Sequence, residues 1–210
     1  MFKDRKEAGE LLARKLAEYH GADAVVYALP RGGVVLGFEI AQALEVPLDL
    51  VIARKIGHPS NPEYAVCAIT EEGELFCDEK ERAMLDLAWL KKEVEKERKE
   101  AKRRKTTYLK NQEHRSAQNK IAIVVDDGVA TGLTLRAALR SIRGEGPREL
   151  VVAIPVAPHD LLNILRTEAD RVVVLKDEQN YLGAVGAYYQ NFPQVSDEEV
   201  IEFLRSVNIG

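Results

Sequence analysis

The chain has 210 residues, of which 46% are hydrophobic and 30% are charged, and its formal net charge is −4. This composition is typical of a globular protein with a sizeable core, and the acidic balance excludes a general attraction to nucleic acid or anionic membranes. No apolar run reaches the roughly 20 residues that span a bilayer. The first seven residues are polar and lack a signal-peptide core, so we expect a cytoplasmic protein with a single domain.

The first third of the chain alternates between helical and strand periodicity. The expected elements are a helix over 3–19, a strand over 24–29, a helix over 34–44 and a strand over 48–53. Residues 57–64 are rich in Gly, Pro, Ser and Asn and are expected to form a loop. A β-hairpin around Gly73 would place Cys67 opposite Cys77. A reducing cytoplasm would keep both cysteines mostly as thiols, with a structural role favoured over a redox or metal role.

Residues 79–115 are expected to form one long helix with a narrow apolar stripe. Within it, residues 91–115 carry eleven Lys and Arg against five Glu, a local charge of +6. The i, i+4 spacing of Glu95 with Lys99 and of Glu100 with Arg104 favours a solvated helix or a cover over the sheet edge. Contact with RNA or DNA phosphates is the alternative.

Strands and helices alternate again in the second half. The expected elements are strands over 121–126, 149–156 and 171–175, helices over 135–142 and 158–167, a C-terminal segment over 177–210 and a closing helix from Ser196. Ser196 and Glu199 have the spacing of a capping box. The alternation predicts an α/β fold with a doubly wound, Rossmann-like and mainly parallel sheet covered by helices on both faces. Right-handed crossovers put the loops after Leu29, Ala53 and Asp126 at the edge where such sheets bind ligands.

The most informative segment spans residues 121–134 and has the sequence Ile-Ala-Ile-Val-Val-Asp-Asp-Gly-Val-Ala-Thr-Gly-Leu-Thr. An apolar strand ends in two carboxylates, which can hold vicinal hydroxyls or a hydrated metal ion. The turn after them offers backbone N–H groups and two Thr hydroxyls to an anion at a helix N-terminus. A Walker A loop is excluded because no Lys lies between Gly128 and Thr134, and the glycines stand four apart, unlike a Rossmann fingerprint. The pattern suggests a ligand like ribose 5-phosphate.

This segment resembles the phosphoribosyl-diphosphate (PRPP) loop of the type I phosphoribosyltransferases. That loop is an apolar strand, two acids, two or three variable residues and then Thr-Gly-x-Thr. The resemblance implies that Asp126 and Asp127 hold the ribose hydroxyls or a Mg²⁺ ion, through water or PRPP, and favour positive charge on the sugar. The residues that it assigns to the 5-phosphate are Gly128, Val129, Ala130, Thr131, Gly132, Leu133 and Thr134. An ordinary αβ turn in another doubly wound protein is the alternative.

A second anion site is expected at the turn that follows the first strand, Pro30-Arg31-Gly32-Gly33. Gly32 and Gly33 permit close backbone approach, the helix behind them presents its positive end, and Arg31 adds a fixed fork suited to phosphate oxygens. In the family, diphosphate binds at this place. The alternative is a tight turn with a solvent-exposed Arg31.

Arg54-Lys55-Ile56-Gly57-His58 leaves the next strand on the same edge. It resembles the residues that open the flexible catalytic loop of several family members, notably the orotate enzymes. Lys55 and His58 are therefore catalytic candidates, and a histidine without a role is the alternative for His58.

The resemblance implies transfer of the 5-phosphoribosyl group from PRPP to a nitrogenous base such as a nucleobase, with Mg²⁺ as cofactor and a homodimer as the assembly. In the 6-oxopurine salvage enzymes an Asp stands just before the Thr-Gly. Ala130 stands there in this chain, as in the adenine and orotate branches, which counts against a hypoxanthine–guanine enzyme. Tyr188, Tyr189 and Phe192 are candidates for stacking on the base, and anchoring the C-terminus to the core is the alternative.

Two other functions remain open at this point. One is a PRPP-sensing regulator that binds nucleic acid through residues 91–115, and the other is an enzyme that uses a different phosphorylated sugar. No helix-turn-helix is visible, so nucleic acid is not an expected partner. A membrane is not an expected partner either, because no apolar run is long enough to span one.

Overall fold

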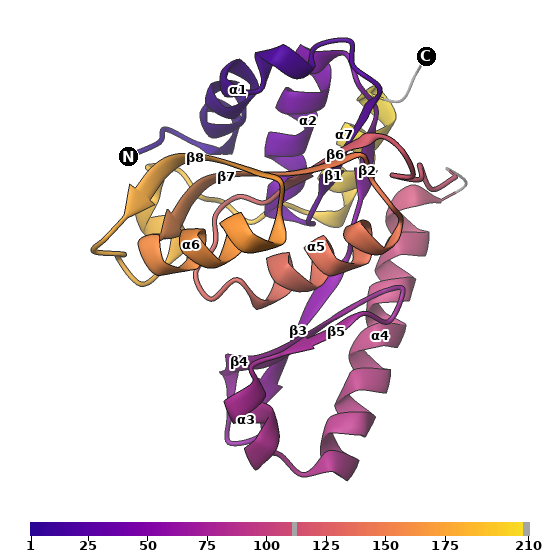
Figure 1. Cartoon of the computed structure of the whole chain (residues 1–210), viewed down its shortest axis with the longest axis vertical. Coiled ribbons are helices and arrows are strands. Elements are labelled where there is room, and N and C mark those ends of the chain that lie inside the picture. Colours follow the sequence, from indigo (N-terminus) through magenta and orange to yellow (C-terminus); the bar gives the residue numbers. More distant parts are fainter. Residues whose placement is uncertain (111–112, 208–210) are drawn as a thin grey trace.

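The computed structural model of the protein describes residues 1–110 and 113–207. Within them, a five-stranded sheet and a three-stranded sheet are built by different parts of the chain. Figure 1 shows the larger sheet between two layers of helices, with the smaller sheet in a lobe that extends away from it. The predicted α/β class and the parallel sheet with helices on both faces are therefore confirmed.

The larger sheet has the strand order β2-β1-β6-β7-β8, and all its neighbours are parallel. Its strands are β1 (Ala24–Ala28), β2 (Leu48–Leu50), β6 (Ile121–Val125), β7 (Glu149–Pro158) and β8 (Arg171–Glu178). Ala28 pairs with Leu50 on one side and with Val125 on the other. The carboxyl ends of β1, β2 and β6 therefore meet at one edge.

Helices cover both faces of this sheet because its strands are apolar on both sides. Val26 packs with α1 (Arg5–Lys15) and α2 (Gly32–Leu44), whereas Val25 and Tyr27 face α5 (Leu133–Gly144) and α6 (His159–Glu168). The C-terminal helix α7 (Asp197–Val207) packs against α2, with Phe38 and Phe203 in ring contact. Short 3₁₀ turns lie at η1 (Ala17–Tyr19) and η2 (Val185–Tyr188).

The capping box predicted at the start of α7 is confirmed. The Ser196 amide donates to the Glu199 carboxylate at 2.7 Å, and the Glu199 amide donates to the Ser196 hydroxyl at 3.1 Å. These two bonds satisfy amides that the first helical turn leaves without partners.

The lobe consists of β3 (Ala53–His58), β4 (Asn61–Thr70), β5 (Leu75–Cys77), α3 (Glu79–Met84) and α4 (Leu87–Leu109). The expected loop over 57–64 is wrong, because β3 and β4 continue through it and leave only Pro59 and Ser60 between them. The pairing register shifts around Gly57, so the Gly and Pro residues mark an irregular ladder. Pairing between strands has overridden the local preference for a loop.

The expected single helix over 79–115 is also wrong, because Leu85 and Asp86 are not helical and separate α3 from α4. Leu85 is buried in an extended conformation, and the Asp86 side chain accepts a hydrogen bond of 2.7 Å from the Trp89 amide. This N-cap starts α4 anew. The helix ends at Leu109, residues 113–119 are not helical, and residues 111–112 lie outside the described part.

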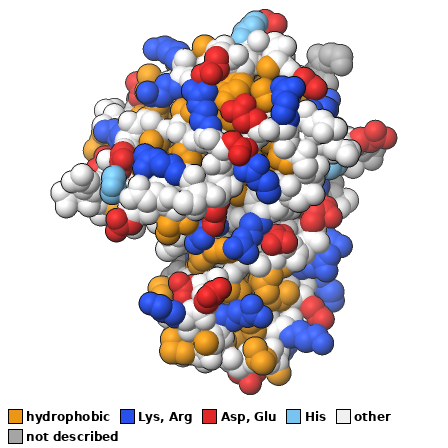
Figure 2. Space-filling view, in the orientation of Figure 1, with side chains coloured by type: hydrophobic (Ala, Val, Ile, Leu, Met, Phe, Trp, Pro, Cys, Tyr) orange, Lys and Arg blue, Asp and Glu red, His pale blue; other side chains and the backbone are white. Residues whose placement is uncertain are grey.

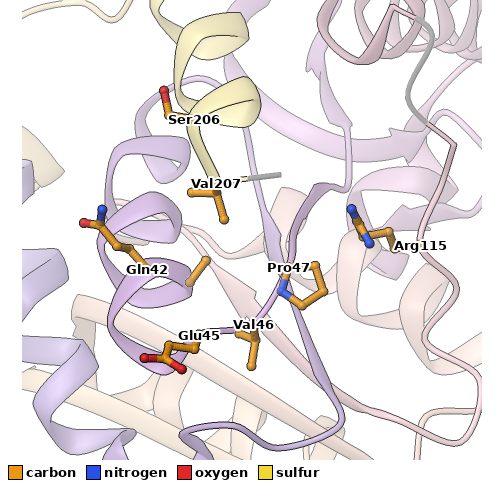
Figure 3. Close-up of a pocket in the computed structure, with 8 residues that line it drawn as sticks. Gln42, Glu45, Val46, Pro47, Arg115, Ser206 and Val207 are labelled. Carbon is orange, nitrogen blue, oxygen red and sulfur yellow. The ribbon is translucent and has the colours of Figure 1, made fainter. Parts of the chain in front are cut away.

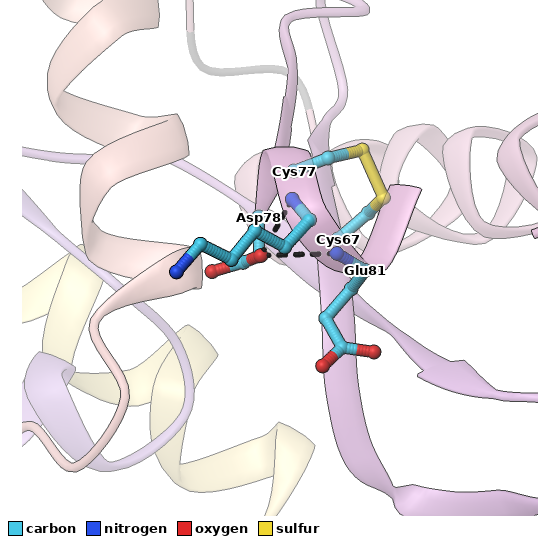
Figure 4. Close-up of a disulfide and its surroundings, with 5 residues drawn as sticks. Cys67, Cys77, Asp78 and Glu81 are labelled. Carbon is cyan, nitrogen blue, oxygen red and sulfur yellow. Dashed lines mark hydrogen bonds between the residues drawn. A yellow bond between two sulfur atoms is a disulfide. The ribbon is translucent and has the colours of Figure 1, made fainter. Parts of the chain in front are cut away.

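The predicted hairpin around Gly73 is confirmed, and β4 and β5 pair with Cys67 opposite Cys77. The expectation of free thiols is wrong, since the two cysteines form a disulfide (Figure 4). Cross-strand pairing places the two sulfurs within bonding reach. Directly after Cys77, the Asp78 carboxylate accepts from the amides of Lys80 and Glu81 and caps α3.

Acidic side chains accompany the basic residues of α4, and Figure 2 shows the two charges interspersed over the lobe. The pairs are Lys96 with Glu93, Arg103 and Arg104 with Glu100, and Lys105 with Glu71. The predicted Glu100–Arg104 pair forms, and the helix is thus a charge-paired element of the lobe. Among the described residues, no helix is both long and apolar enough to cross a membrane.

Candidate functional site

Two loops that are far apart in the sequence meet at the carboxyl edge of β1 and β6. Asp126 and Asp127 follow β6, and the turn Arg31–Gly33 follows β1. The Leu29 amide donates to the Val125 carbonyl at 2.9 Å, which fixes the two strand ends side by side. The edge predicted from right-handed crossovers therefore brings the acid pair and the expected anion turn together.

Gly32 allows the closest approach between these loops. A Cβ placed on Gly32 would lie 1.8 Å from Asp127 Oδ2, and one on Gly33 would lie 3.0 Å from the Asp126 Cα. Contacts below 3.0 Å essentially do not occur at real Cβ atoms, so a side chain at residue 32 would displace the carboxylate. The peptide between Pro30 and Arg31 is cis.

The loop after the acid pair leads into the N-terminus of α5. Gly132 precedes the helix with a φ of +79°, and a Cβ there would lie 2.6 Å from a methyl carbon of Leu161. The Val129 amide donates to the Val156 carbonyl at 3.0 Å, which ties the loop to β7. Ala130 and Thr131 are exposed. The exposed loop residues thus lie at the N-terminus of α5, a position at which helices commonly bind anions.

The acid pair lies in a setting that disfavours two negative charges. Burial, and then the charge of Asp127, hold the pKa of Asp126 well above its ordinary value. Burial also raises the pKa of Asp127, while the neighbouring Arg5 acts in the opposite direction. A cation at this position would therefore be favourable.

Two adjacent carboxylates suit Mg²⁺, a cation that takes one or two carboxylates together with water and phosphate oxygens. Among the described residues, no group of three or more His, Cys, Asp and Glu side chains could form a metal site. Asp126 and Asp127 therefore fit an ion that a phosphorylated ligand brings with it better than a metal held by the protein alone.

Arg5 is a site residue that the sequence pattern did not reveal. It is the first residue of α1, is 8% exposed, and its Nε lies 2.8 Å from Asp127 Oδ2. A cation in the first turn of a helix opposes the helix dipole, and this local mismatch is the signal that could have identified it.

Arg31 contacts the C-terminal helix. Its guanidinium lies 3.5 Å from the Asp197 carboxylate, which also accepts a 2.7 Å hydrogen bond from the Tyr108 hydroxyl. Burial, and then this hydrogen bond, raise the pKa of Tyr108 to about 12. The turn at Arg31–Gly33 therefore contacts α7 through Asp197, and the same carboxylate links α7 to Tyr108 of α4.

A family model described as the phosphoribosyl transferase domain matches residues 3–190. The chain belongs to the phosphoribosyl transferase family. It is 41% identical to the protein TT1426 from Thermus thermophilus, whose crystal structure superposes with a TM-score of 0.81 over 98% of each chain. It is also 40% identical over 206 residues to proteins of two Mycobacterium tuberculosis strains, CDC 1551 and H37Rv, provisionally named phosphoribosyl transferases. The match covers 97% of this chain and 46% of those relatives, so the chain spans about half their length.

The structure separates the two catalytic candidates that the family resemblance placed together. Lys55 pairs with Ala68 in the face of the small sheet that packs on α5, where Ala68 and Phe76 contact Leu133. His58 lies at the far end of β3, and its Nδ1 accepts from the Ser60 amide at 3.1 Å. Lys55 is thus on the sheet face that packs on α5, whereas His58 is at the tip of a hairpin.

The aromatic candidates lie in the C-terminal part of the phosphoribosyl transferase domain and just beyond it. Tyr188 and Tyr189 are buried, and their hydroxyls bond to the Leu182 amide and the Asp127 carbonyl respectively. Phe192 is 36% exposed, and the centre of its ring lies 3.7 Å from the guanidinium carbon of Arg5. Both tyrosines thus have anchoring contacts, while Phe192 retains an accessible surface.

A pocket of about 420 Å³ lies at the opposite edge of the sheet, where α2 ends and β2 begins (Figure 3). It is lined by Gln42, Glu45, Val46, Pro47, Arg115 and Val207, among others. None of the candidate site residues contributes to it.

Proposed function

We propose that the protein is a phosphoribosyltransferase that binds PRPP, transfers its 5-phosphoribosyl group to a nitrogenous base and releases diphosphate. One observation carries this proposal. The acid pair, the Arg31–Gly33 turn and the loop before α5 lie at one sheet edge, so a single ligand with hydroxyls, a phosphate and a diphosphate could contact all three. Membership of the phosphoribosyl transferase family supports it.

Each loop would contact a different part of PRPP. The amides and hydroxyls of residues 128–134 would bind the 5-phosphate at the N-terminus of α5. The acid pair would face the ribose hydroxyls. Arg31, Lys55 and the backbone of Gly32 and Gly33 would face the diphosphate, where guanidinium and ammonium groups stabilise the developing negative charge. Mg²⁺ held by Asp126, Asp127 and PRPP would supply further charge neutralisation there.

The reaction forms one bond at C1 of the ribose and breaks another. A nitrogen of the base donates its electron pair to C1, the C1–oxygen bond breaks, and diphosphate leaves with that bond's electrons. The new N-glycosidic product loses the proton of the attacking nitrogen to solvent. The carboxylates stabilise the positive charge that develops on the sugar, and most of the acceleration comes from positioning and electrostatics.

The acceptor is proposed to be a nucleobase outside the hypoxanthine–guanine group, because Ala130 replaces the Asp of that branch. The exposed part of Phe192 is the candidate surface for stacking on it. His58 is retained as a candidate that would act only if the β3–β4 hairpin bends toward the site. A homodimer, which the family resemblance implies, completes the proposal together with the cytoplasmic location that is expected from the sequence.

A panel of nucleobases with PRPP and Mg²⁺, monitored for diphosphate release, tests this function. We expect release with one base and none with the Asp126→Asn, Asp127→Asn double variant, whose folding is checked by circular dichroism. Lys55→Ala is expected to lower kcat at least tenfold. Absence of both PRPP binding and diphosphate release with every base would refute the proposal. PRPP binding without release would restrict the protein to PRPP sensing.

A further inference from the structure

The disulfide lies on the face of the small sheet that packs on α3 and α4. Cys67 and Cys77 are directly paired across β4 and β5 (Figure 4), and both pack in a hydrophobic cluster with Leu85 and Leu90. Cys67 is fully buried, whereas Cys77 is partly exposed. A reagent in solution would therefore approach the bond from the Cys77 side.

The neighbouring residue pair of the same two strands faces the larger sheet's helices instead. Side chains alternate between the two faces of a strand, so Ala68 and Phe76, which are also directly paired, point away from the disulfide. They pack with Leu133 and Ala137 of α5. Leu133 is the first residue of α5 and follows Gly132. One pair of strands thus connects the disulfide to the start of α5.

β5 is a short strand at the edge of the small sheet, next to β4. It comprises only Leu75–Cys77, and its carboxyl end leads directly to Asp78, the cap of α3. A strand of three residues contributes few ladder bonds of its own. The covalent link to Cys67 is therefore a large part of what holds β5 in position, because a cross-link restricts the states that the segment can reach when it opens.

Phe76 transmits the position of β5 to the first two turns of α5. It is buried against Leu133, and its ring centre lies 4.2 Å from the guanidinium carbon of Arg136 and 4.4 Å from that of Arg140. The amides that precede and begin α5 belong to residues 128–134, which we call the phosphate loop. A change in the attachment of β5 therefore reaches the phosphate loop through one buried aromatic side chain.

We propose, on the basis of the proposed PRPP site, that the Cys67–Cys77 disulfide is a redox switch of the phosphate loop. In the oxidised form the bond fixes β5, and Phe76 supports the start of α5. In the reduced form β5 loosens, this support weakens, and PRPP binds less tightly. A cytoplasmic location is expected from the sequence, and disulfides in that compartment are mostly transient or redox-sensing.

Reduction uses a dithiol as the co-reactant. One thiolate of the dithiol attacks Cys77 Sγ, the S–S bond breaks, and Cys67 leaves as a thiolate that takes up a proton. The second thiol of the reagent attacks the mixed disulfide, which releases Cys77 as a thiol and closes a disulfide within the reagent. Two electrons and two protons thereby pass from the dithiol to the protein, and an oxidised dithiol reverses the exchange.

The wild-type chain in its two redox states provides the main test. Cys67 and Cys77 are the two cysteines of the sequence, so thiol titration after denaturation reads the redox state directly. PRPP affinity is measured by calorimetry with Mg²⁺, before and after reduction with dithiothreitol. Hydrogen exchange of residues 75–77 and 131–137 is measured without ligand. We expect reduction to weaken PRPP binding roughly tenfold and to accelerate exchange of both segments by a similar factor, and reoxidation to restore both.

Two variants separate the switch from a direct effect of the reagent. The Cys67→Ala, Cys77→Ala double variant cannot form the bond, so it should bind PRPP like the reduced wild type and should not respond to dithiothreitol. In Phe76→Ala the connection to α5 is missing. Reduction should then still accelerate exchange of 75–77, but it should change PRPP affinity less than about twofold. The comparison of wild-type redox states needs no substitution, so it remains decisive if either variant does not fold.

Three results would overturn the switch. The first is two free thiols in the native chain after treatment with an oxidised dithiol, because the bond then does not form. The second is equal PRPP affinity in the two redox states. The third is faster exchange confined to 75–77, which would make the disulfide a staple of the lobe alone. If the wild-type chain binds no PRPP in either state, the proposed function fails, while exchange of 131–137 still decides whether the bond acts on α5.

Discussion

Gly32 lies directly against Asp127: a Cβ at residue 32 would be 1.8 Å from the Asp127 Oδ2 atom. The turn after β1 and the acid pair after β6 are therefore packed as one unit, without space for a side chain between them. This contact joins the proposed diphosphate and ribose regions of the site, and each of them depends on the position of the other.

Gly32→Ala is expected to displace the Asp127 carboxylate and to weaken PRPP binding at least tenfold, with a loss of stability of about 1–3 kcal/mol from overpacking. Urea unfolding and calorimetry measure the two effects. Gly144→Ala is the matched control, because no atom lies within 4 Å of a Cβ at residue 144. It is expected to leave PRPP affinity unchanged and to change stability by less than about 1 kcal/mol. Wild-type affinity in Gly32→Ala would contradict the packing described for the site.

Arg31 is expected to exchange its contact with Asp197 for one with diphosphate. Arg31→Ala should weaken PRPP binding roughly 10- to 100-fold, because a charge-assisted hydrogen bond to phosphate is lost. Arg31→Lys keeps the charge but loses the planar fork and should give an intermediate affinity. Asp197→Asn removes the competing carboxylate and should strengthen binding slightly, about threefold. Weaker binding in Asp197→Asn would show that Asp197 positions Arg31 instead of competing for it.

His114 is expected to make stability decrease at alkaline pH. Its Nδ1 lies 2.9 Å from an Asp49 oxygen and its Nε2 lies 3.1 Å from a Glu145 oxygen. Hydrogen bonds to Asp49 and then to Glu145 raise the pKa of His114 to about 9. The folded-state pKa exceeds the ordinary value of 6.5, so the contribution is complete below pH 6.5 and disappears as the pH rises through 9.

The size of this contribution is about 1 kcal/mol, because the imidazole is 35% exposed and solvent screens its ion pairs. Urea unfolding at pH 6.5 and pH 9.5 measures it. His114→Gln should be less stable than the wild type at the lower pH and approach it at the higher one. Glu145→Gln removes one of the two partners and should give an intermediate dependence. An equal difference between wild type and His114→Gln at both pH values would disprove the assignment.

Phe76 packs the lobe against the start of α5. It is 6% exposed and packs in a cluster with Leu133. The guanidinium carbons of Arg136 and Arg140 lie 4.2 and 4.4 Å from the centre of its ring. Phe76→Ala should cost about 3 kcal/mol of unfolding free energy and weaken PRPP binding, because the start of α5 loses its support. Phe76→Leu should recover more than half of both losses. If Phe76→Ala had the same urea midpoint of unfolding as the wild type, the support of α5 by Phe76 would be ruled out.

Local patterns were sufficient for the sheet and for the main loop of the site. The apolar run 121–125 predicted a buried parallel strand, and the following acids and glycines predicted a strand–loop–helix turn that the structure confirms. The same patterns were wrong for 57–64 and for 79–115. Pairing of β3 with β4 overrode loop composition, and Asp86 began a new helix inside an otherwise continuous helical pattern.

The sequence by itself determined which residues could carry the chemistry, because the order of strand, two acids and Thr-Gly-x-Thr is a short-range property of the chain. The tertiary structure alone decided which partners those residues have. Arg5 reaches Asp127 across 122 positions, and Arg31 reaches Asp197 across 166. Such contacts depend on how helices pack on the sheet, and no periodicity within a segment encodes them.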